Sequence, residues 1–132
     1  MAQRLEELPV FLKARAFSVA VTAILVRAPC SRNLKLRDQI AAANESILAN
    51  MAEGFEQSTD ACLANYLYIA KGSLAEVVTR LRGVQRFGWL TPAECATLSG
   101  EDEEMQRMLG GWIKYLSRSG WKDRGRFKDR HG

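Results

Sequence analysis

The 132-residue chain has one histidine, three cysteines and three prolines, and these low counts argue against several classes of site. The histidine is His131, next to the C-terminus, whereas a catalytic triad needs a base held in a fixed position. No Glu-x-x-His motif, which builds the di-metal site of some helical bundles, is present. We therefore expect a non-enzymatic protein with no catalytic residue, no metal site and no cofactor.

Cysteine pairs and long apolar runs are also missing. Cys30, Cys62 and Cys95 are odd in number and widely spaced, a pattern that favours neither a disulfide framework nor a zinc site. We expect reduced thiols in a cytoplasmic protein, with Cys62 and Cys95 buried on helices. The longest apolar stretch, 19–26, is too short to span a bilayer, so no membrane partner is expected.

Apolar residues make up 47% of the chain, and they recur at helical spacing, not in alternation. Connections contain Pro29, Gly54 and Gly88, and the segments between them are long enough for antiparallel neighbours. We predict an all-α, antiparallel up-down-up-down four-helix bundle over 1–118, followed by a basic, disordered tail over 119–132. The predicted helices span about 9–28, 33–53, 60–87 and 92–117.

Three local signals refine this prediction. Gly54 is expected to cap the second helix in a left-handed conformation. Thr91 and Glu94 have the spacing of a capping box, with Pro92 at the first helical position. The pair Gly110–Gly111 would cost about 2 kcal/mol inside a helix. We expect another helix, of the same or a neighbouring subunit, to approach closely there.

The first predicted helix carries more apolar residues than one core-facing stripe needs. Val10, Phe17 and Ile24 lie on one face, while Val19 and Val26 lie outside it. This helix is therefore expected to be central in the bundle or shared with a neighbouring subunit.

The chain has a net charge of +4, and most of its basic residues fall in three groups. These nucleic-acid-binding candidates are Arg27, Arg32, Lys35 and Arg37, then Arg80, Arg82 and Arg86, and then Arg118, Lys122, Arg124, Arg126, Lys128 and Arg130. The first two groups fall at the same end of an up-down-up-down bundle, where clustered donors could bind phosphate. Trp121 and Phe127 interleave with the tail charges and could stack on unpaired bases. A solvated basic surface is the other interpretation.

A family resemblance extends over nearly the whole chain to Leu116, and its specific motif lies in residues 39–76. The run SILANMAEGFEQS, followed by YLYIAKGSLAE, resembles the four-helix-bundle family encoded within intervening sequences of bacterial 23S ribosomal RNA genes. The matching positions are Gln39-Ile40, Ser46-Ile47, Asn50, Ala52 to Phe55, Ser58, Leu67 to Ala70, Gly72 to Glu76, Gly88 and Leu90. The segment MQRMLGGWIKYL is also similar to the end of Avd, the related accessory protein of diversity-generating retroelements.

The resemblance implies a homo-oligomer, a ring-like pentamer, that binds RNA or a ribonucleoprotein. The other reading is an Avd-like adaptor that docks on a reverse transcriptase. Ala41 and Ala42 stand where the family usually has two arginines, and Leu48 stands where it usually has proline. We therefore expect the basic surface at the helix ends and in the tail, with the second helix facing another subunit.

Overall fold

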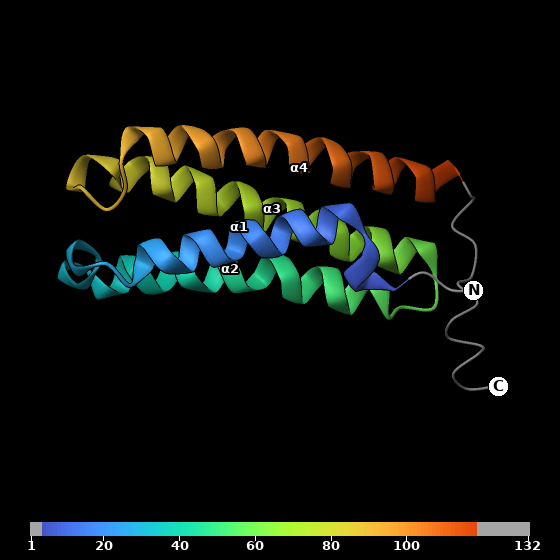
Figure 1. Ribbon diagram of the computed structural model, residues 1–132. Helices are drawn as coiled ribbons and strands as arrows, with labels where there is room; N and C mark the ends of the chain where they lie inside the picture. The colour runs from blue at the N-terminus through green and yellow to red at the C-terminus, as the bar shows by residue number, and fades with distance from the viewer. Residues whose placement is uncertain (1–3, 119–132) are drawn as a thin grey trace.

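The computed structural model describes residues 4–118, and these fold into helices with short connections. The four long helices are α1 (Pro9–Leu25), α2 (Leu34–Phe55), α3 (Asp60–Val84) and α4 (Pro92–Arg118). The short 3-10 helices are η1 (Leu5–Glu7), η2 (Ala28–Arg32) and η3 (Gln85–Phe87). Each long helix runs antiparallel to the one before it (Figure 1), which confirms the predicted all-α four-helix bundle.

α1 begins at Pro9. Proline suits this position because an N–H in the first turn would have no partner within the helix. Its inward, buried face consists of Val10, Ala14, Phe17, Val21 and Ile24. The helix ends at Leu25, three residues before the predicted end. Pro29 lacks the N–H that would bond the Leu25 carbonyl in a continued α-helix, and its ring would clash with that carbonyl, so α1 ends at Leu25 and the chain continues as η2. Cys30 is buried in η2, and its Sγ donates to the Ile24 carbonyl oxygen at 3.2 Å.

Gly54 lies inside the last turn of α2, so the prediction that it caps this helix is wrong. Gly88 is the one glycine of residues 4–118 with a positive φ, of 76°. A Cβ on Gly54 would lie 2.7 Å from the Cβ of Tyr66 and 3.1 Å from a methyl of Leu63, both on α3. The position needs glycine because α3 approaches the α2 backbone more closely than any side chain allows.

α3 begins after Thr59, whose Oγ1 accepts the Cys62 N–H at 3.2 Å. The sequence predicted a helix to residue 87, but the α-helix ends at Val84 and continues as η3. Gly88 then reverses the chain in a left-handed conformation. Cys62 is exposed, against expectation, because it lies on the outward side of α3, next to the buried Leu63, whereas Cys95 is buried as expected.

The capping box at the start of α4 is confirmed. The Thr91 N–H donates to Glu94 Oε1 at 2.8 Å, and the Glu94 N–H donates to Thr91 Oγ1 at 3.1 Å. From Pro92 the helix is continuous through Gly100 to Arg118. Two reciprocal bonds therefore fix where the last helix begins.

Among the described residues, no helix backbone closely approaches the pair Gly110–Gly111. A Cβ on Gly110 would be 3.8 Å from the Lys71 Nζ, and one on Gly111 would meet nothing within 4 Å. Trp112 packs edge-on against Phe55 instead, with ring centroids 6.4 Å apart. The expected approach of a helix from the same subunit is wrong, and an approach from a neighbouring subunit stays a prediction.

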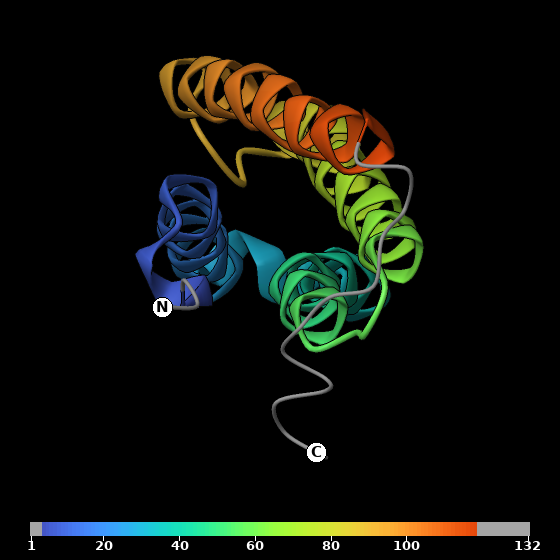
Figure 2. The same cartoon turned by 90° about the vertical axis from the view of Figure 1, so that its right-hand side faces the viewer.

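α3 packs closely on both α2 and α4, whereas α1 packs mainly on α2 and more loosely on α4 (Figure 2). The hydroxyls of Ser46 and Ser73 lie 2.8 Å apart and join α2 to α3. The Lys71 Nζ donates to Gln106 Oε1 at 2.8 Å and joins α3 to α4. α1 is therefore the helix least enclosed by the rest of the bundle.

Candidate nucleic-acid interface

Two of the three basic groups lie at the end of the bundle that carries η2 and η3, here called the η2–η3 end (Figure 1). Alternate connections of an antiparallel bundle emerge at the same end. The end of α1, the start of α2 and the end of α3 therefore bring these side chains to one region. The residues are Arg27, Arg32, Lys35, Arg37, Arg80, Arg82 and Arg86.

Arg27 is engaged in a structural ion pair. Its Nη1 and Nη2 donate to the two carboxylate oxygens of Glu94 at 2.8 and 2.6 Å, and Nη1 also donates to the Trp89 carbonyl oxygen at 3.3 Å. The hydrogen bond from Arg27 and that from the Thr91 N–H lower the pKa of Glu94 to about 2. The bond to Glu94 likewise raises the pKa of Arg27. Arg27 is therefore occupied by Glu94 and is a poor phosphate ligand.

Two further members of these groups are also paired with carboxylates. Arg37 lies 3.2 Å from Asp38, its neighbour in the chain. Arg80 lies 2.9 Å from Glu76, one turn earlier on α3, and also donates to Gln39 Oε1 at 3.2 Å. Their positive charges are largely offset within the protein.

Four cations at this end keep their charge uncompensated. Within residues 4–118, Arg32, Lys35 and Arg86 take part in no ion pair. Arg82 donates from Nε to the Ser99 hydroxyl at 3.3 Å, and that partner is neutral. Arg32, Lys35, Arg82 and Arg86 are called the end patch below.

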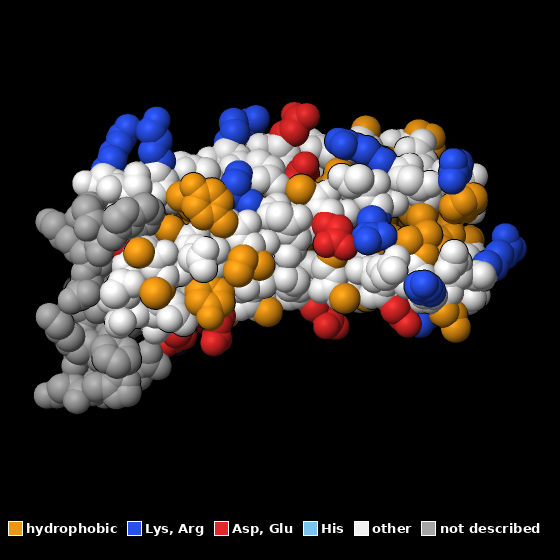
Figure 3. All heavy atoms as spheres, turned by 180° about the vertical axis from the view of Figure 1, so that it is seen from behind, with side chains coloured by type: hydrophobic (Ala, Val, Ile, Leu, Met, Phe, Trp, Pro, Cys, Tyr) orange, Lys and Arg blue, Asp and Glu red, His pale blue; other side chains and the backbone are white. Residues whose placement is uncertain are grey.

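A concavity of about 410 Å³ opens beside the end patch. It is lined by Pro29, Arg32, Asn33, Arg86, Phe87 and Trp89, none of which is acidic. Figure 3 shows Lys and Arg side chains around exposed hydrophobic atoms at the right-hand end of the molecule, away from the residues drawn in grey. A basic rim around an apolar floor suits an anionic ligand that also has an apolar part.

Phe87 is the residue of this region that the sequence reasoning missed. Its side chain is 52% exposed, and the guanidinium carbon of Arg86 lies 4.8 Å from its ring centroid. Trp89, two residues later, is buried and provides the apolar support beneath the turn. The available signal was an aromatic residue between an arginine and a glycine, at the last position of the helix predicted over 60–87.

The third basic group does not join the other two. Arg118 ends α4 at the opposite end of the bundle from η2 and η3 (Figure 1). The other predicted residues of this group lie outside the described part of the chain; they are Lys122, Arg124, Arg126, Lys128 and Arg130. Trp121 and Phe127 also lie outside it.

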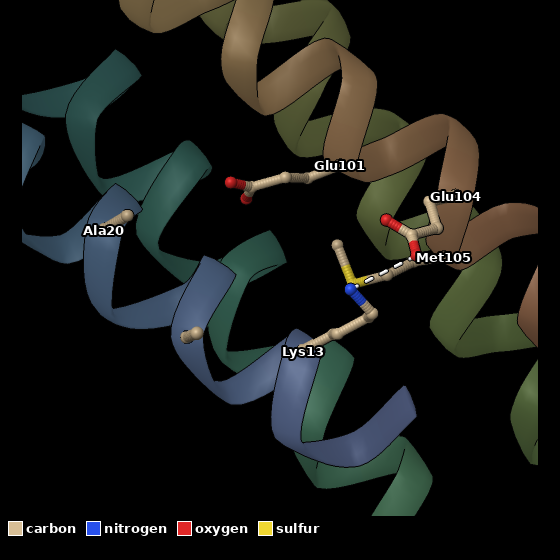
Figure 4. A pocket seen from close by; sticks show the side chains of 6 residues that line it. Lys13, Ala20, Glu101, Glu104 and Met105 are labelled. Carbon is tan, nitrogen blue, oxygen red and sulfur yellow. Dashed lines mark ion pairs between the residues drawn. The ribbon is translucent and has the colours of Figure 1, made fainter. Parts of the chain in front are cut away.

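A smaller hollow of about 210 Å³ separates α1 from α4 (Figure 4). Lys13 of α1 and Glu104 of α4 bridge it in an ion pair of 3.2 Å, and both are half exposed. Glu101 extends across it from α4 toward α1. The mixture of one lysine and two glutamates leaves no excess positive charge for a phosphate, so the hollow is not part of the candidate interface.

The outer side of α1 carries a second apolar stripe, with the same steps of four and three as its buried face. This outer stripe consists of Leu12, Ala16, Val19, Ala23 and Val26. Val19 and Val26 are 65% and 78% exposed. A shallow hollow of about 360 Å³ continues the stripe toward Leu48 on α2. α1 is therefore apolar on two opposite sides, and residues 4–118 cover only one of them.

Within the described residues, no group of three or more His, Cys, Asp or Glu is placed to hold a metal ion. None of the helices in that part of the chain is long and apolar enough to cross a membrane.

Comparisons with known proteins agree with the predicted family. The profile of the 23S rRNA-intervening sequence protein family matches residues 6–111. A crystal structure of a protein of unknown function from the S23 ribosomal protein family of Bacteroides thetaiotaomicron VPI-5482 has a similar fold, with a TM-score of 0.71. The two chains are 24% identical over 80% of this chain and 98% of that one. No curated protein matches. With four-fifths of its length matched, this chain belongs to the 23S rRNA-intervening sequence protein family.

Proposed function

We propose that this protein is a non-enzymatic homo-oligomer that binds RNA, alone or in a ribonucleoprotein, through the end patch. The observation that carries the RNA proposal is the concavity lined by Arg32 and Arg86. In the described part of the chain these cations have no carboxylate partner, and no acidic residue lies in the wall. Phosphate oxygens would supply the missing negative charge, and the planar arginine fork suits them well. Such contacts hold an RNA backbone without reading its sequence.

Binding of this kind has a measurable salt dependence. Each phosphate that a protein neutralises on a single strand contributes a slope of about −0.7 to log K against log salt concentration. The four cations of the end patch therefore predict a slope of about −3 for one site. Removal of Arg32 and Arg86 together should roughly halve that slope.

The test is fluorescence anisotropy with a labelled RNA strand of about 12 nucleotides, a length within the range of known single-strand sites. The double variant Arg32→Ala/Arg86→Ala should lose at least about 10-fold in affinity at low salt. The matched control is Arg107→Ala/Lys114→Ala, which removes two exposed cations from α4, away from the end patch. Equal losses in the two variants would show a non-specific charge effect and would overturn the assignment of the site.

A wild-type oligomer that binds neither single-stranded nor structured RNA at low salt would overturn the RNA proposal altogether. That result would favour the adaptor role, in which the protein docks on a reverse transcriptase. Co-purification with such an enzyme would then be the next measurement.

The homo-oligomeric part of the proposal is supported by the outer stripe of α1. Isolated exposed apolar residues are common, but a continuous stripe along a helix is typical of an interface. Association would bury Val19 and Val26 at about 25 cal/mol for each Å² of apolar surface removed from water. Ala41 is half buried and lines a second hollow, between α1 and α2. It stands where the family resemblance predicts arginine, so an uncharged residue there suits the same interface.

A ring also requires a second, different surface on each subunit, because head-to-tail contacts join unlike patches. Tyr68 and Ile69 are exposed on α3, and Gly72 beside them has open space around it. Figure 2 shows α1 and α3 on opposite sides of the bundle. Opposed apolar surfaces on α1 and α3 would allow the ring of five subunits that the family resemblance predicts.

A further inference from the structure

We propose that the concavity at the η2–η3 end holds one unpaired RNA base, stacked on the Arg86–Phe87 pair. This inference rests on the proposed RNA binding and adds to it a preference for single-stranded over duplex RNA. The structure contributes three observations: an exposed aromatic platform, a polar group available to the base edge, and a cavity of suitable size.

The platform is preformed. The Arg86 guanidinium lies over the Phe87 ring at 4.8 Å from its centroid, and half of the Phe87 side chain remains exposed. A base can extend this stack on the guanidinium or occupy the other face of the ring, since bases stack on both kinds of group in single-stranded RNA complexes. Exposure of a phenylalanine side chain in a structured turn is unfavourable in water. Stacking would remove that apolar surface from water.

The turn that carries Phe87 is held in place from both sides. Gly88 adopts the left-handed conformation that ends η3, and its N–H donates to the Gln85 carbonyl oxygen at 3.0 Å. Trp89 is buried directly after it, and the Trp89 carbonyl oxygen accepts a hydrogen bond from Arg27. The platform therefore loses little conformational freedom when a base binds.

Asn33 supplies the polar group. Its Oδ1 is used to cap α2, where it accepts the Leu36 N–H at 3.1 Å. That bond fixes the amide so that Nδ2, which has no acceptor within residues 4–118, is free to donate two hydrogens. A ring nitrogen or carbonyl oxygen of a base, or a ribose hydroxyl, can accept them.

The charge and volume of the concavity also suit one RNA base and the phosphate next to it. Its volume of about 410 Å³ lies within the usual range of small-ligand sites, roughly 300–1,000 Å³. Arg32, which lines the same concavity, can contact the phosphate next to the bound base. Bases in an A-form duplex are stacked on each other and have no free face, so a duplex could use the cations but not the platform.

The experiment measures the affinity of the intact protein for three probes: a 12-nucleotide oligoadenylate, a strand of the same length with abasic residues, and a 12-base-pair RNA duplex. Phe87→Ala should weaken oligoadenylate binding by roughly 5- to 100-fold, the range for loss of one stacked base. It should change the affinity for the abasic strand and the duplex by less than about 2-fold and leave the salt slope unaltered. Phe87→Trp should restore oligoadenylate binding.

Two further variants separate stacking from charge and from general exposure. Arg86→Lys keeps the positive charge and loses the planar group, so it should weaken oligoadenylate binding more than duplex binding. Tyr115→Ala removes another exposed aromatic side chain, from α4, and should have no effect. Circular dichroism of Phe87→Ala should show an unchanged helix content, because the ring is not part of the core.

Wild-type affinity of Phe87→Ala for oligoadenylate would overturn the stacking site. If Arg32→Ala/Arg86→Ala still weakened binding, the proposed function would stand without the stacking site. If Phe87→Ala lost the same affinity for all three probes, the stacking site would also be overturned, since the ring would then act through the fold. Absence of RNA binding by the wild-type protein would overturn both proposals.

Discussion

Arg27 and Glu94 form a two-point ion pair, with N–O distances of 2.8 and 2.6 Å, between residues 67 positions apart. Arg27 follows the end of α1, and Glu94 lies in the first turn of α4. These are the two neighbouring helices whose packing is loosest (Figure 2). The pair therefore supports the contact between α1 and α4 at the η2–η3 end, where apolar packing contributes less.

This pair predicts a dependence of stability on acid pH. The pKa of Glu94 is about 2 in the folded protein and near its ordinary 4.5 in the unfolded chain. A lowered folded-state pKa gives stability that is present above pH 4.5 and is lost as the pH falls toward 2. The free energy of unfolding in urea should therefore fall over this interval.

Glu94→Gln should make that fall less steep, because glutamine cannot titrate but can still complete the capping box. Glu103→Gln is the control, since Glu103 is exposed on the same helix and has no ion pair within the described chain. Identical acid profiles for the wild-type protein and Glu94→Gln would contradict a stabilising role for the pair.

Substitution by alanine should have opposite effects on stability at Gly54 and at Gly83. Gly54→Ala would force a Cβ to 2.7 Å from the Tyr66 Cβ, which overpacks the α2–α3 contact. The strain of about 1–3 kcal/mol should exceed the gain in helix propensity of about 1 kcal/mol, so the variant should be less stable than wild type. Gly83→Ala meets no atom within 4 Å and should stabilise α3 by about 0.5–1 kcal/mol. Urea unfolding of both variants measures the two signs.

Asn44 joins α2 to α1, and its substitution measures how much this link contributes to stability. It is 3% exposed, and its Nδ2 donates to the Ser18 carbonyl oxygen at 3.0 Å and to Thr22 Oγ1 at 3.3 Å. Asn44→Ala should lower the free energy of unfolding by about 1–3 kcal/mol, the range for loss of a buried hydrogen-bonding partner. Asn50→Ala should cost less, since Asn50 bonds only within α2, to Ser46, in the part of the chain described. A larger loss for Asn50→Ala would contradict this role of Asn44.

Features set by local chemistry could be predicted from the sequence. The four helices follow from apolar spacing, and the capping box of Thr91 and Glu94 follows from two residues three positions apart. Local patterns do not predict features that are caused by a contact between residues distant in the sequence. Gly54 has the sequence features of a helix cap, and only the position of Tyr66 shows that close packing requires it.

The candidate site shows the same division. Topology was sufficient to place Arg32 and Arg86 at one end of the bundle. The ion pair that occupies Arg27 joins residues 67 apart and has no sequence signature. Phe87 was missed because the exposure of an aromatic residue depends on how the turn at Gly88 directs it.

Lysine substitutions on the α1 and α3 surfaces distinguish a ring from a two-fold dimer. In a head-to-tail ring, Val19→Lys spoils the α1 surface of a subunit and leaves its α3 surface intact, whereas Ile69→Lys does the reverse. Each variant alone should be a 14.8 kDa monomer by light scattering. An equimolar mixture should form a dimer, because one intact α1 surface can meet one intact α3 surface. Leu34→Lys, at an exposed leucine on neither surface, should assemble like the wild-type protein.

The other outcomes distinguish the possible geometries. If Val19→Lys were monomeric while Ile69→Lys assembled fully, the contact would be a symmetric one between two copies of α1. Such a contact closes as a dimer and forms no ring. Full assembly of both variants would show that neither surface is an interface. A dimer that appears only in the mixture requires two unlike surfaces on each subunit, and this result would support the ring because a chain of such contacts closes only through rotational symmetry.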